Sequence, residues 1–506
     1  MAARDTTSDP AALAPDAAVP DATAGERSYQ RIAVYALLAV TVLRLVWLVG
    51  NPINLYPDEA QYWLWSRHLA LGYFSKPPLL PWIIALTTSI LGEDEFAIRV
   101  ASPLLHLATG LVVYAIARRL YDARVACWSA VLYATLPAVS LSSAIMSTDV
   151  PLMLCWAVGL YAFIRARESA GWRWWIIAGV AAGIGLLAKY AMEYWLLSAL
   201  ILVLAFRDER RHLRHLFATA VIAHLIYLPN LLWNVANGFV SYKHTEANAN
   251  LAGSLLHPKA FLEFFSAQFG VFGPLLFGTL LVILLVYPRT LADRRARLLA
   301  VFALPTLAMM LTVSFLSRAH ANWSAPTYVS ATVLVAAFLV AHGRTVLLAA
   351  SLVIHVGAAL FLVGGRQTAA ALGTELPAKL DLLHRVRGWD ALGRTVGDLL
   401  LHRPGFILMT WSREDLAALI YYVLPHPFDA VIYNPGGGAR NQFEMETDMS
   451  NYVGRDFLFI TQSEIEPWNA AFFTAVSPPI RITIPLGSGA TRRYFAYDLG
   501  GFKGYR

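Results

Sequence analysis

The chain has 506 residues, of which 57% are hydrophobic and only 14% are charged, and its formal net charge at pH 7 is +7. This composition excludes an ordinary soluble enzyme and places the chain in a lipid bilayer. The positive charge is concentrated in short connections between apolar segments, so it indicates membrane orientation, and no nucleic acid partner is expected.

The N-terminal tail, residues 1–31, is rich in Ala, Asp, Thr and Pro and has no apolar core. This composition excludes a cleavable signal peptide and predicts a disordered segment. The only two cysteines, Cys127 and Cys155, fall inside apolar segments. Neither a disulfide framework nor a thiolate metal site is therefore expected.

Eleven apolar segments approach the roughly 17 to 25 residues that cross a bilayer, although several are short. They lie near residues 32–50, 96–117, 125–143, 148–164, 174–188, 192–206, 215–232, 270–287, 298–316, 325–341 and 345–363. The predicted fold class is therefore an α-helical polytopic membrane protein, with a transmembrane domain over residues 32–365.

The connections between these segments alternate in basic residues. One set of short connections holds 15 Lys or Arg in 37 residues: 118–124, 165–173, 207–214, 288–297 and 342–344. The other set is longer and holds only 7: 51–99, 143–148, 188–191, 233–269 and 317–324. Because basic connections stay in the cytoplasm, we expect the first set and the N-terminal tail there, and eleven crossings place the C-terminus outside.

The first outer connection carries the most informative motif. It reads Pro57-Asp58-Glu59-Ala60-Gln61-Tyr62-Trp63, then Phe74-Ser75-Lys76-Pro77-Pro78-Leu79. Residues 58–70 have helical periodicity and residues 79–91 are apolar but too short to span, so both are predicted to be helices along the interface. Adjacent residues on a helix diverge by about 100°, so we expect one of the two carboxylates, not both, to face a substrate.

Two residues of this motif have alternative interpretations. Asp58 either caps its helix, because it precedes Gln61 by three positions, or faces a substrate. Lys76 precedes two prolines that fix an extended backbone, so its ammonium is held on a stiff loop. That position suits a phosphate, but also a lysine that snorkels or binds lipid headgroups.

Further polar residues lie at the outer ends of later segments. Asp149 either caps the helix that it begins or supports a site. A charge at membrane depth, such as Lys189, costs roughly 2.5–3.5 kcal/mol unless a tight outer turn brings it to water or a partner. His244 and Glu246 are too few for a recognisable metal site. The remaining candidates are Glu59, Tyr62, Arg318, His320 and Asn322.

Residues 366–506 are polar and are predicted to form a small outer α/β domain. Its expected elements are strands at 406–410, 429–433 and 456–461 and a helix at 413–424. The glycine run at 435–438 lacks the Lys-Ser/Thr of a phosphate loop, so it is predicted to be a turn.

The motif at 57–63, Lys76-Pro77-Pro78 and Thr148-Asp149-Val150-Pro151 together resemble the GT-C superfamily of glycosyltransferases, related to protein O-mannosyltransferases. The most similar branches are the bacterial enzymes that transfer aminoarabinose or galacturonic acid to lipid A and lipopolysaccharide core. The resemblance covers residues 30–365 in architecture. The segments Asn322-Trp323 and 440–443 are also similar to bacterial members.

The resemblance implies a cavity facing the periplasm, a lipid-linked monosaccharide donor and inverting transfer. Asp58 would be the general base or the carboxylate that orients the acceptor, Lys76 would contact the donor phosphate, and Asp149 would support the site. In the aminoarabinose branch an acidic residue before the lysine helps to hold a metal, whereas this chain has Ser75. We therefore predict no metal site and no required cofactor, with a divalent cation optional.

The predicted protein is thus a monomeric glycosyltransferase of the bacterial inner membrane, whose partners are a polyprenyl-phosphate sugar, membrane lipids and an acceptor. Lipid A or core oligosaccharide is the first acceptor expected and a protein hydroxyl the second. A flippase for lipid-linked sugars and a membrane scaffold are the alternatives. No internal repeat relates the two halves, and the candidate residues gather on one face, which argues against a transporter.

Overall fold

The computed structural model describes residues 24–50, 53–249, 256–377, 380–381, 383–487 and 490–505. Most of the predicted N-terminal tail, residues 1–23, lies outside the described residues. Helix α1 (Ala24–Gly50) begins earlier than the composition indicated, so residues 24–31 are helical.

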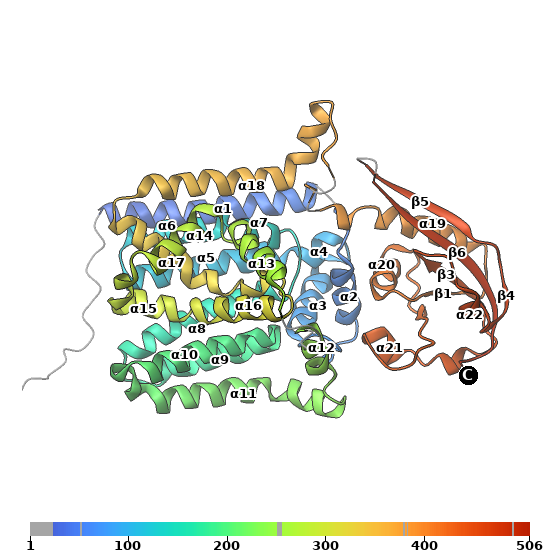
Figure 1. Cartoon of the computed structure of the whole chain (residues 1–506), viewed down its shortest axis with the longest axis horizontal. Helices are drawn as coiled ribbons and strands as arrows, with labels where there is room; N and C mark the ends of the chain where they lie inside the picture. Colours follow the sequence, from blue (N-terminus) through green and yellow to red (C-terminus); the bar gives the residue numbers. More distant parts are fainter. Residues whose placement is uncertain are drawn as a thin grey trace, which may run out of the picture.

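A bundle of long helices forms one part of the molecule, and a sheet domain stands at one end of it (Figure 1). The bundle helices are α1, α5 (Ala101–Leu120), α6 (Ala123–Thr135), α8 (Asp149–Glu168), α9 (Arg173–Ala188), α10 (Glu193–Ala205), α11 (Leu213–Ala236), α14 (Pro274–Leu285), α15 (Arg294–Val301), α16 (Leu304–Leu316), α17 (Thr327–Ala341) and α18 (Thr345–Ala371). Shorter helices lie toward the sheet domain: α2 (Pro57–Ser66), α3 (Leu79–Leu91), α4 (Glu95–Arg99), α7 (Pro137–Ser142), α12 (Val240–Ala249) and α13 (Pro258–Val271).

Each of the eleven predicted spans falls on one or two of these helices; the spans 125–143 and 298–316, for example, are divided between α6 and α7 and between α15 and α16. Among the described residues, six helices are long and apolar enough to cross a membrane, or seven if the bent pair α13 and α14 is one span. The protein is therefore a multi-pass membrane protein, while the number of crossings stays a prediction.

Small residues allow bundle helices to approach closely. A side chain at Gly179 of α9 would lie 2.8 Å from the backbone oxygen of Thr219 on α11, and one at Gly183 would lie 2.9 Å from that of Ala223. Glycines four residues apart share one helix face, so α9 presents a smooth face to α11.

The two helices predicted along the interface are present. Helix α3 has the bounds expected from its apolar run, and α2 ends at Ser66, four residues earlier than expected. Helix α2 packs against α20 (Arg413–Tyr422) of the C-terminal domain, where the buried Trp63 ring meets Tyr421 edge-on with centroids 4.9 Å apart. The sheet domain is therefore docked on α2, within the connection 51–99.

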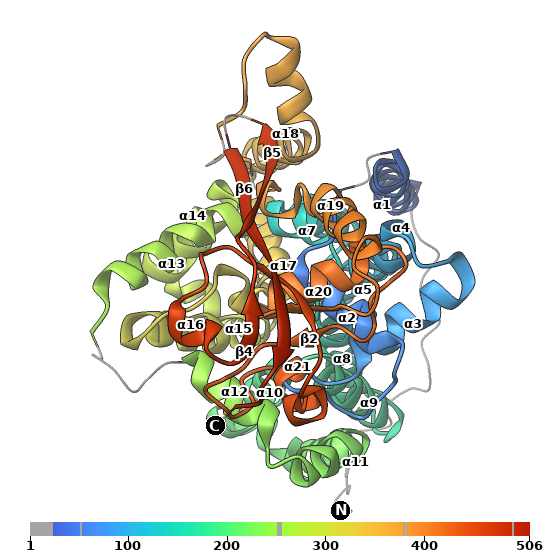
Figure 2. The same ribbon diagram turned by 90° about the vertical axis from the view of Figure 1, so that its right-hand side faces the viewer.

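The C-terminal domain contains one mixed sheet, seen from its own end in Figure 2. Its strands are β1 (Ile407–Thr410), β2 (Val431–Ile432), β3 (Phe457–Thr461), β4 (Phe473–Val476), β5 (Ile480–Gly487) and β6 (Ala490–Phe502). The order is β2-β1-β3-β6-β4, with β5 also paired to β6; β1 is parallel to β2 and β3, and β6 is antiparallel to its neighbours. The predicted strands and helix match β1, α20, β2 and β3, whereas helix α19 (Trp389–Leu401) and β4, β5 and β6 were not predicted.

Candidate functional site

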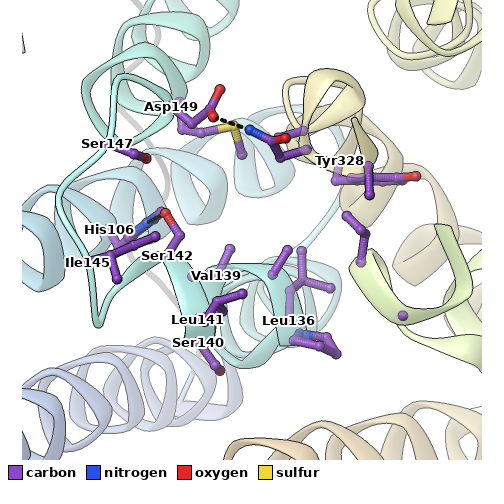
Figure 3. Close-up of a pocket in the computed structure, with 18 of the residues that line it drawn as sticks. His106, Leu136, Val139, Ser140, Leu141, Ser142, Ile145, Ser147, Asp149 and Tyr328 are labelled. Carbon is purple, nitrogen blue, oxygen red and sulfur yellow. Dashed lines mark hydrogen bonds between the residues drawn. The ribbon is translucent and has the colours of Figure 1, made fainter. Parts of the chain in front are cut away.

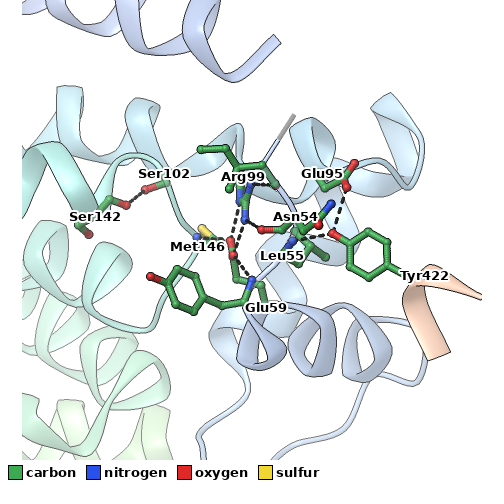
Figure 4. Close-up of polar contacts among 11 residues, drawn as sticks. Asn54, Leu55, Glu59, Glu95, Arg99, Ser102, Ser142, Met146 and Tyr422 are labelled. Atoms are coloured by element: carbon green, nitrogen blue, oxygen red, sulfur yellow. Dashed lines mark hydrogen bonds and ion pairs between the residues drawn. The ribbon is translucent and has the colours of Figure 1, made fainter. Parts of the chain in front are cut away.

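The adjacent carboxylates of α2 face different surroundings. Glu59 is buried, and its oxygens accept from Arg99 Nε at 2.9 Å and Nη2 at 2.6 Å (Figure 4). It also accepts from the backbone amides of Met146 and Tyr56, at 2.8 and 2.9 Å. Glu59 thus connects three segments of the chain, while its contact with a substrate stays a prediction.

Asp58 is on the exposed side of the same helix, with its side chain 58% accessible. Its Oδ1 accepts from Nη1 of Arg413 at 2.7 Å, and Arg413 also contacts the side-chain oxygen of Gln61. The amide of Tyr56, which precedes α2, is bound by Glu59, so Glu59 and not Asp58 makes the hydrogen bond at this helix start. The capping interpretation of Asp58 therefore loses its basis.

The loop that presents Lys76 is fixed through its backbone. A tight turn joins Tyr73 N to Lys76 O at 3.1 Å. Side chains from three elements hold the same loop: Asn230 donates to Leu71 O at 2.7 Å, Ser241 to Tyr73 O at 2.7 Å, and Gln442 accepts from Phe74 N at 2.6 Å. Together with the two prolines that follow, these bonds give Lys76 a defined position.

Asp149 joins two other predicted site residues. Lys189, at the end of α9, places its Nζ 2.6 Å from Asp149 Oδ1, and Asn322 donates to Oδ2 at 2.8 Å. The three residues come from distant parts of the sequence. Lys189 stands in the short turn between α9 and α10, and the ion pair supplies a partner for a charge between two apolar helices.

Lys76 lies within electrostatic reach of both ion pairs. Burial lowers the pKa of its ammonium, Lys189 and Arg413 lower it further, and Asp58 and Asp149 oppose this effect. Within the described ranges, no carboxylate forms an ion pair with Lys76. The site therefore combines two paired acids with one additional cation, an arrangement that suits an anionic ligand.

Two predicted histidines border this cation. Burial lowers the pKa of His244 to about 4, with smaller effects from Lys76 and Arg413, so its ring is neutral at pH 7. The pKa of His320 is also lowered, first by burial and then by Arg318. Neutral rings can donate or accept hydrogen bonds from a sugar without adding charge.

The other predicted residues differ in their surroundings. Tyr62 is buried, and burial, followed by Asp58, raises the pKa of its phenol well above its usual value. Its hydroxyl therefore stays protonated at neutral pH. Arg318 is exposed and forms no ion pair within the described residues. Its charge acts on His320.

A cavity of about 420 Å³ adjoins the site (Figure 3). Asp149 and Asn322 form a polar part of its wall, whereas most of its lining is apolar and comes from the segment 136–145 and from α13 and α18. Neither Asp58 nor Lys76 is among the described lining residues. The cavity thus meets the charged site at Asp149 and can hold an apolar chain attached to a polar head.

The described residues contain no group of three His, Cys, Asp or Glu that could hold a metal ion. His244 instead packs its ring edge against Phe74, with centroids 5.5 Å apart, and Glu246 is exposed. Metal dependence stays a prediction.

The sequence alone did not indicate Arg413 as a site residue, nor did it indicate the side chains that hydrogen-bond to the backbone of the loop at 71–76. No local pattern could connect Arg413 to Asp58, because 355 positions separate them. Gln442 belongs to the segment 440–443, which the sequence analysis found similar to bacterial family members. Its hydrogen bond with Phe74 N shows that this segment helps to hold the loop of Lys76.

Comparison with known proteins connects these features to a chemistry. Residues 75–233 match the family described as dolichyl-phosphate-mannose-protein mannosyltransferase. The lipid A galacturonosyltransferase RgtD of Rhizobium johnstonii is 30% identical over 440 residues, which cover 85% of this chain and 91% of that protein. The lipopolysaccharide core galacturonosyltransferase RgtA of the same organism is 28% identical and covers 48% of this chain and 50% of its own length.

The fold is also similar to a solved structure. The crystal structure of ArnT from Cupriavidus metallidurans bound to undecaprenyl phosphate has a TM-score of 0.65 and 17% sequence identity, covering 92% of this chain and 97% of that one. At this identity the likeness concerns the fold. It includes the sheet domain, because nearly all of both chains is covered.

Proposed function

The chain belongs to the GT-C superfamily of glycosyltransferases, and we propose that it transfers a monosaccharide from undecaprenyl phosphate to lipid A or lipopolysaccharide core. The similarity to the galacturonosyltransferases supports both this acceptor class and galacturonic acid as the first sugar to test. The structural observation on which the proposal depends is that Lys76 interacts electrostatically with both ion pairs, Asp58 with Arg413 and Asp149 with Lys189.

The donor phosphate binds at Lys76. When the bond between the sugar C1 and the phosphate oxygen breaks, the polyprenyl phosphate leaves with additional negative charge. A fixed ammonium stabilises this charge more in the transition state than in the ground state, which is the condition for faster transfer. Because this donor has no nucleotide diphosphate, a divalent cation is optional.

Asp58 acts as the general base. The acceptor hydroxyl attacks C1 from the side opposite the phosphate, so the new bond has inverted configuration. Its proton becomes acidic as the bond forms, and a carboxylate at hydrogen-bond distance accepts it. The exposure of Asp58 supports this role, since an acceptor can reach it from the outer side.

The apolar cavity beside Asp149 accommodates part of the lipid carrier. Its polar wall at Asp149 and Asn322 meets the charged site, and its apolar lining matches an isoprenoid chain. The ArnT structure, which has a similar fold, was determined with undecaprenyl phosphate bound, and this supports the same class of ligand for the present chain.

Two observations support an active site on the periplasmic side of the inner membrane. The connections rich in Lys and Arg alternate with the long connections that carry the site, which is the pattern of cytoplasmic and outer loops. The sheet domain and helices α2, α3 and α12 lie at one end of the bundle (Figure 1). A polar domain at this end of the bundle must be surrounded by water, and the periplasm provides that environment.

Transfer by purified protein tests the proposal. Undecaprenyl-phosphate galacturonic acid and lipid A are supplied, and mass spectrometry scores the product; undecaprenyl-phosphate aminoarabinose tests the second sugar. Asp58→Asn is expected to lower turnover by about 10²- to 10⁴-fold, the usual contribution of a general base. Glu168→Gln, at the end of α8 and paired to Arg119 on the surface, serves as the control for loss of an exposed carboxylate charge. Normal transfer by Asp58→Asn would exclude Asp58 as the base, and movement of the intact donor across vesicles without transfer would identify a flippase.

A further inference from the structure

The ion pair between Asp58 and Arg413 connects the two domains at the candidate site. We propose that Arg413, from the C-terminal domain, is a positioning residue: it holds Oδ1 of Asp58 so that Oδ2 receives the proton of the acceptor hydroxyl. This inference rests on the proposed function, in which Asp58 is the base. It gives the sheet domain a part in the chemistry itself.

The guanidinium contacts α2 in a way that fixes the Asp58 side chain. Nη1 of Arg413 donates to Oδ1 of Asp58 at 2.7 Å and also contacts the oxygen of Gln61. Residues three apart on a helix lie on the same face, so one nitrogen bridges two side chains of α2. Within the described residues Oδ2 of Asp58 accepts no hydrogen bond, and it is the oxygen available to a substrate.

The helix that carries Arg413 is held in place relative to α2. The hydroxyl of Tyr422 accepts from Leu55 N at 2.6 Å and donates to Glu95 at 3.0 Å, and the hydroxyl of Tyr421 donates to Glu93 O at 2.8 Å. Both tyrosines lie at the C-terminal end of α20, whereas Arg413 begins it. Arg413 is therefore attached to a rigid element, in contrast to an arginine on a loose surface loop.

An exposed carboxylate side chain such as that of Asp58 rotates between several conformations when nothing holds it. Only some of these direct an oxygen at the acceptor, and a displacement of about 1 Å from the reacting position can reduce a rate on the order of 100-fold. An arginine that holds one oxygen removes the unproductive conformations. Within the described residues Arg413 has a carboxylate partner and Lys76 has none, so Lys76 is a cation available to the donor phosphate.

Steady-state kinetics of full-length variants test this role. Arg413→Gln is expected to lower kcat on the order of 100-fold while the KM for donor and for acceptor changes less than about 3-fold. Arg413→Lys keeps a charged donor and is expected to recover most of the lost rate. Arg394→Gln is the matched control, because Arg394 pairs with Asp390 on the exposed surface of the same domain. Thermal unfolding of each variant shows whether the fold is retained.

The double variant Asp58→Asn with Arg413→Gln separates this role from others. If Arg413 acts through Asp58, the second substitution does not lower the residual rate of Asp58→Asn further. Additive losses, an increased KM for the donor with unchanged kcat, or an unchanged kcat in Arg413→Gln would each overturn the inference. Failure of the proposed function is distinguishable, because in that case Asp58→Asn alone transfers sugar at the normal rate.

Discussion

Lys189 and Asp149 form an ion pair with Nζ and Oδ1 only 2.6 Å apart, although one residue follows α9 and the other begins α8. Both side chains are largely buried, at 20% and 12% exposure. Each of these two buried charges stabilises the other. If one is removed, the remaining charge still has the free-energy cost of desolvation but no longer has the attraction that offsets it.

Asp149→Asn tests this dependence. The amide retains an oxygen for Asn322 but leaves the Lys189 charge without its partner. We expect a loss of roughly 2 kcal/mol in stability, less than the roughly 3–5 kcal/mol of fully buried pairs because Lys189 keeps some access to water. Thermal unfolding of detergent-purified protein measures the change. The double variant with Lys189→Gln is expected to regain part of the loss.

Glu168→Gln supplies the comparison for an exposed pair. Glu168 accepts from Arg119 at 2.7 Å, and both side chains are about 40% exposed. Such pairs contribute roughly 0–1 kcal/mol. Equal destabilisation by Asp149→Asn and Glu168→Gln would show that burial of the first pair has no energetic consequence.

Glu59→Gln is expected to affect folding more than chemistry. The substitution leaves the Arg99 guanidinium, only 3% exposed, without its counter-charge. Removing one partner of such a buried pair costs about 3–5 kcal/mol. The yield of monodisperse protein from size-exclusion chromatography is expected to fall strongly, whereas Asp58→Asn gives a normal yield. A well-folded but inactive Glu59→Gln protein would instead return Glu59 to the substrate site.

The local elements of this fold could be predicted where short-range rules determine them. Helix α3 has its expected bounds because an apolar run lies between Pro78 and Gly92, which both interrupt helices. The hairpin of β5 and β6 was not predicted, although Ile482 and Ile484 alternate with exposed residues as a strand requires. Pro485 lies within that run, and its place close to the end of β5 explains how the sheet tolerates it.

The candidate site could be predicted as a set of residues but not as a set of contacts. Asp149, Lys189 and Asn322 stand out because polar residues are rare among apolar spans. Their pairing depends on how distant helices pack, and no local pattern encodes it. Arg413 could not be found at all, since it lies in an ordinary polar domain and is significant only because α20 docks on α2.

Gly72→Ala is expected to displace the loop that carries Lys76. A β-carbon at this position would lie 2.5 Å from the Trp233 ring and 2.7 Å from the Asn230 amide, which itself holds Leu71 O. Either the loop or the amide must move, so we expect weaker donor binding by at least several-fold together with lower stability. Gly278→Ala is the control, because open space surrounds that glycine of α14. Unchanged donor affinity in Gly72→Ala would show that Lys76 does not depend on this packing.

As the pH is raised, donor binding is expected to weaken earlier than it would if Lys76 had the pKa of an ordinary lysine. Burial, reinforced by Lys189, lowers the pKa of Lys76 from its usual 10.5. The protonated form carries the charge, so the phosphate is bound fully below the lowered pKa and binding is lost as pH rises through it. Affinity for undecaprenyl phosphate, measured between pH 7 and 11, is expected to show this loss. In Lys76→Arg the guanidinium stays charged throughout, so the alkaline loss should disappear. The same loss in both proteins would assign the titration to another group and remove Lys76 from the phosphate site.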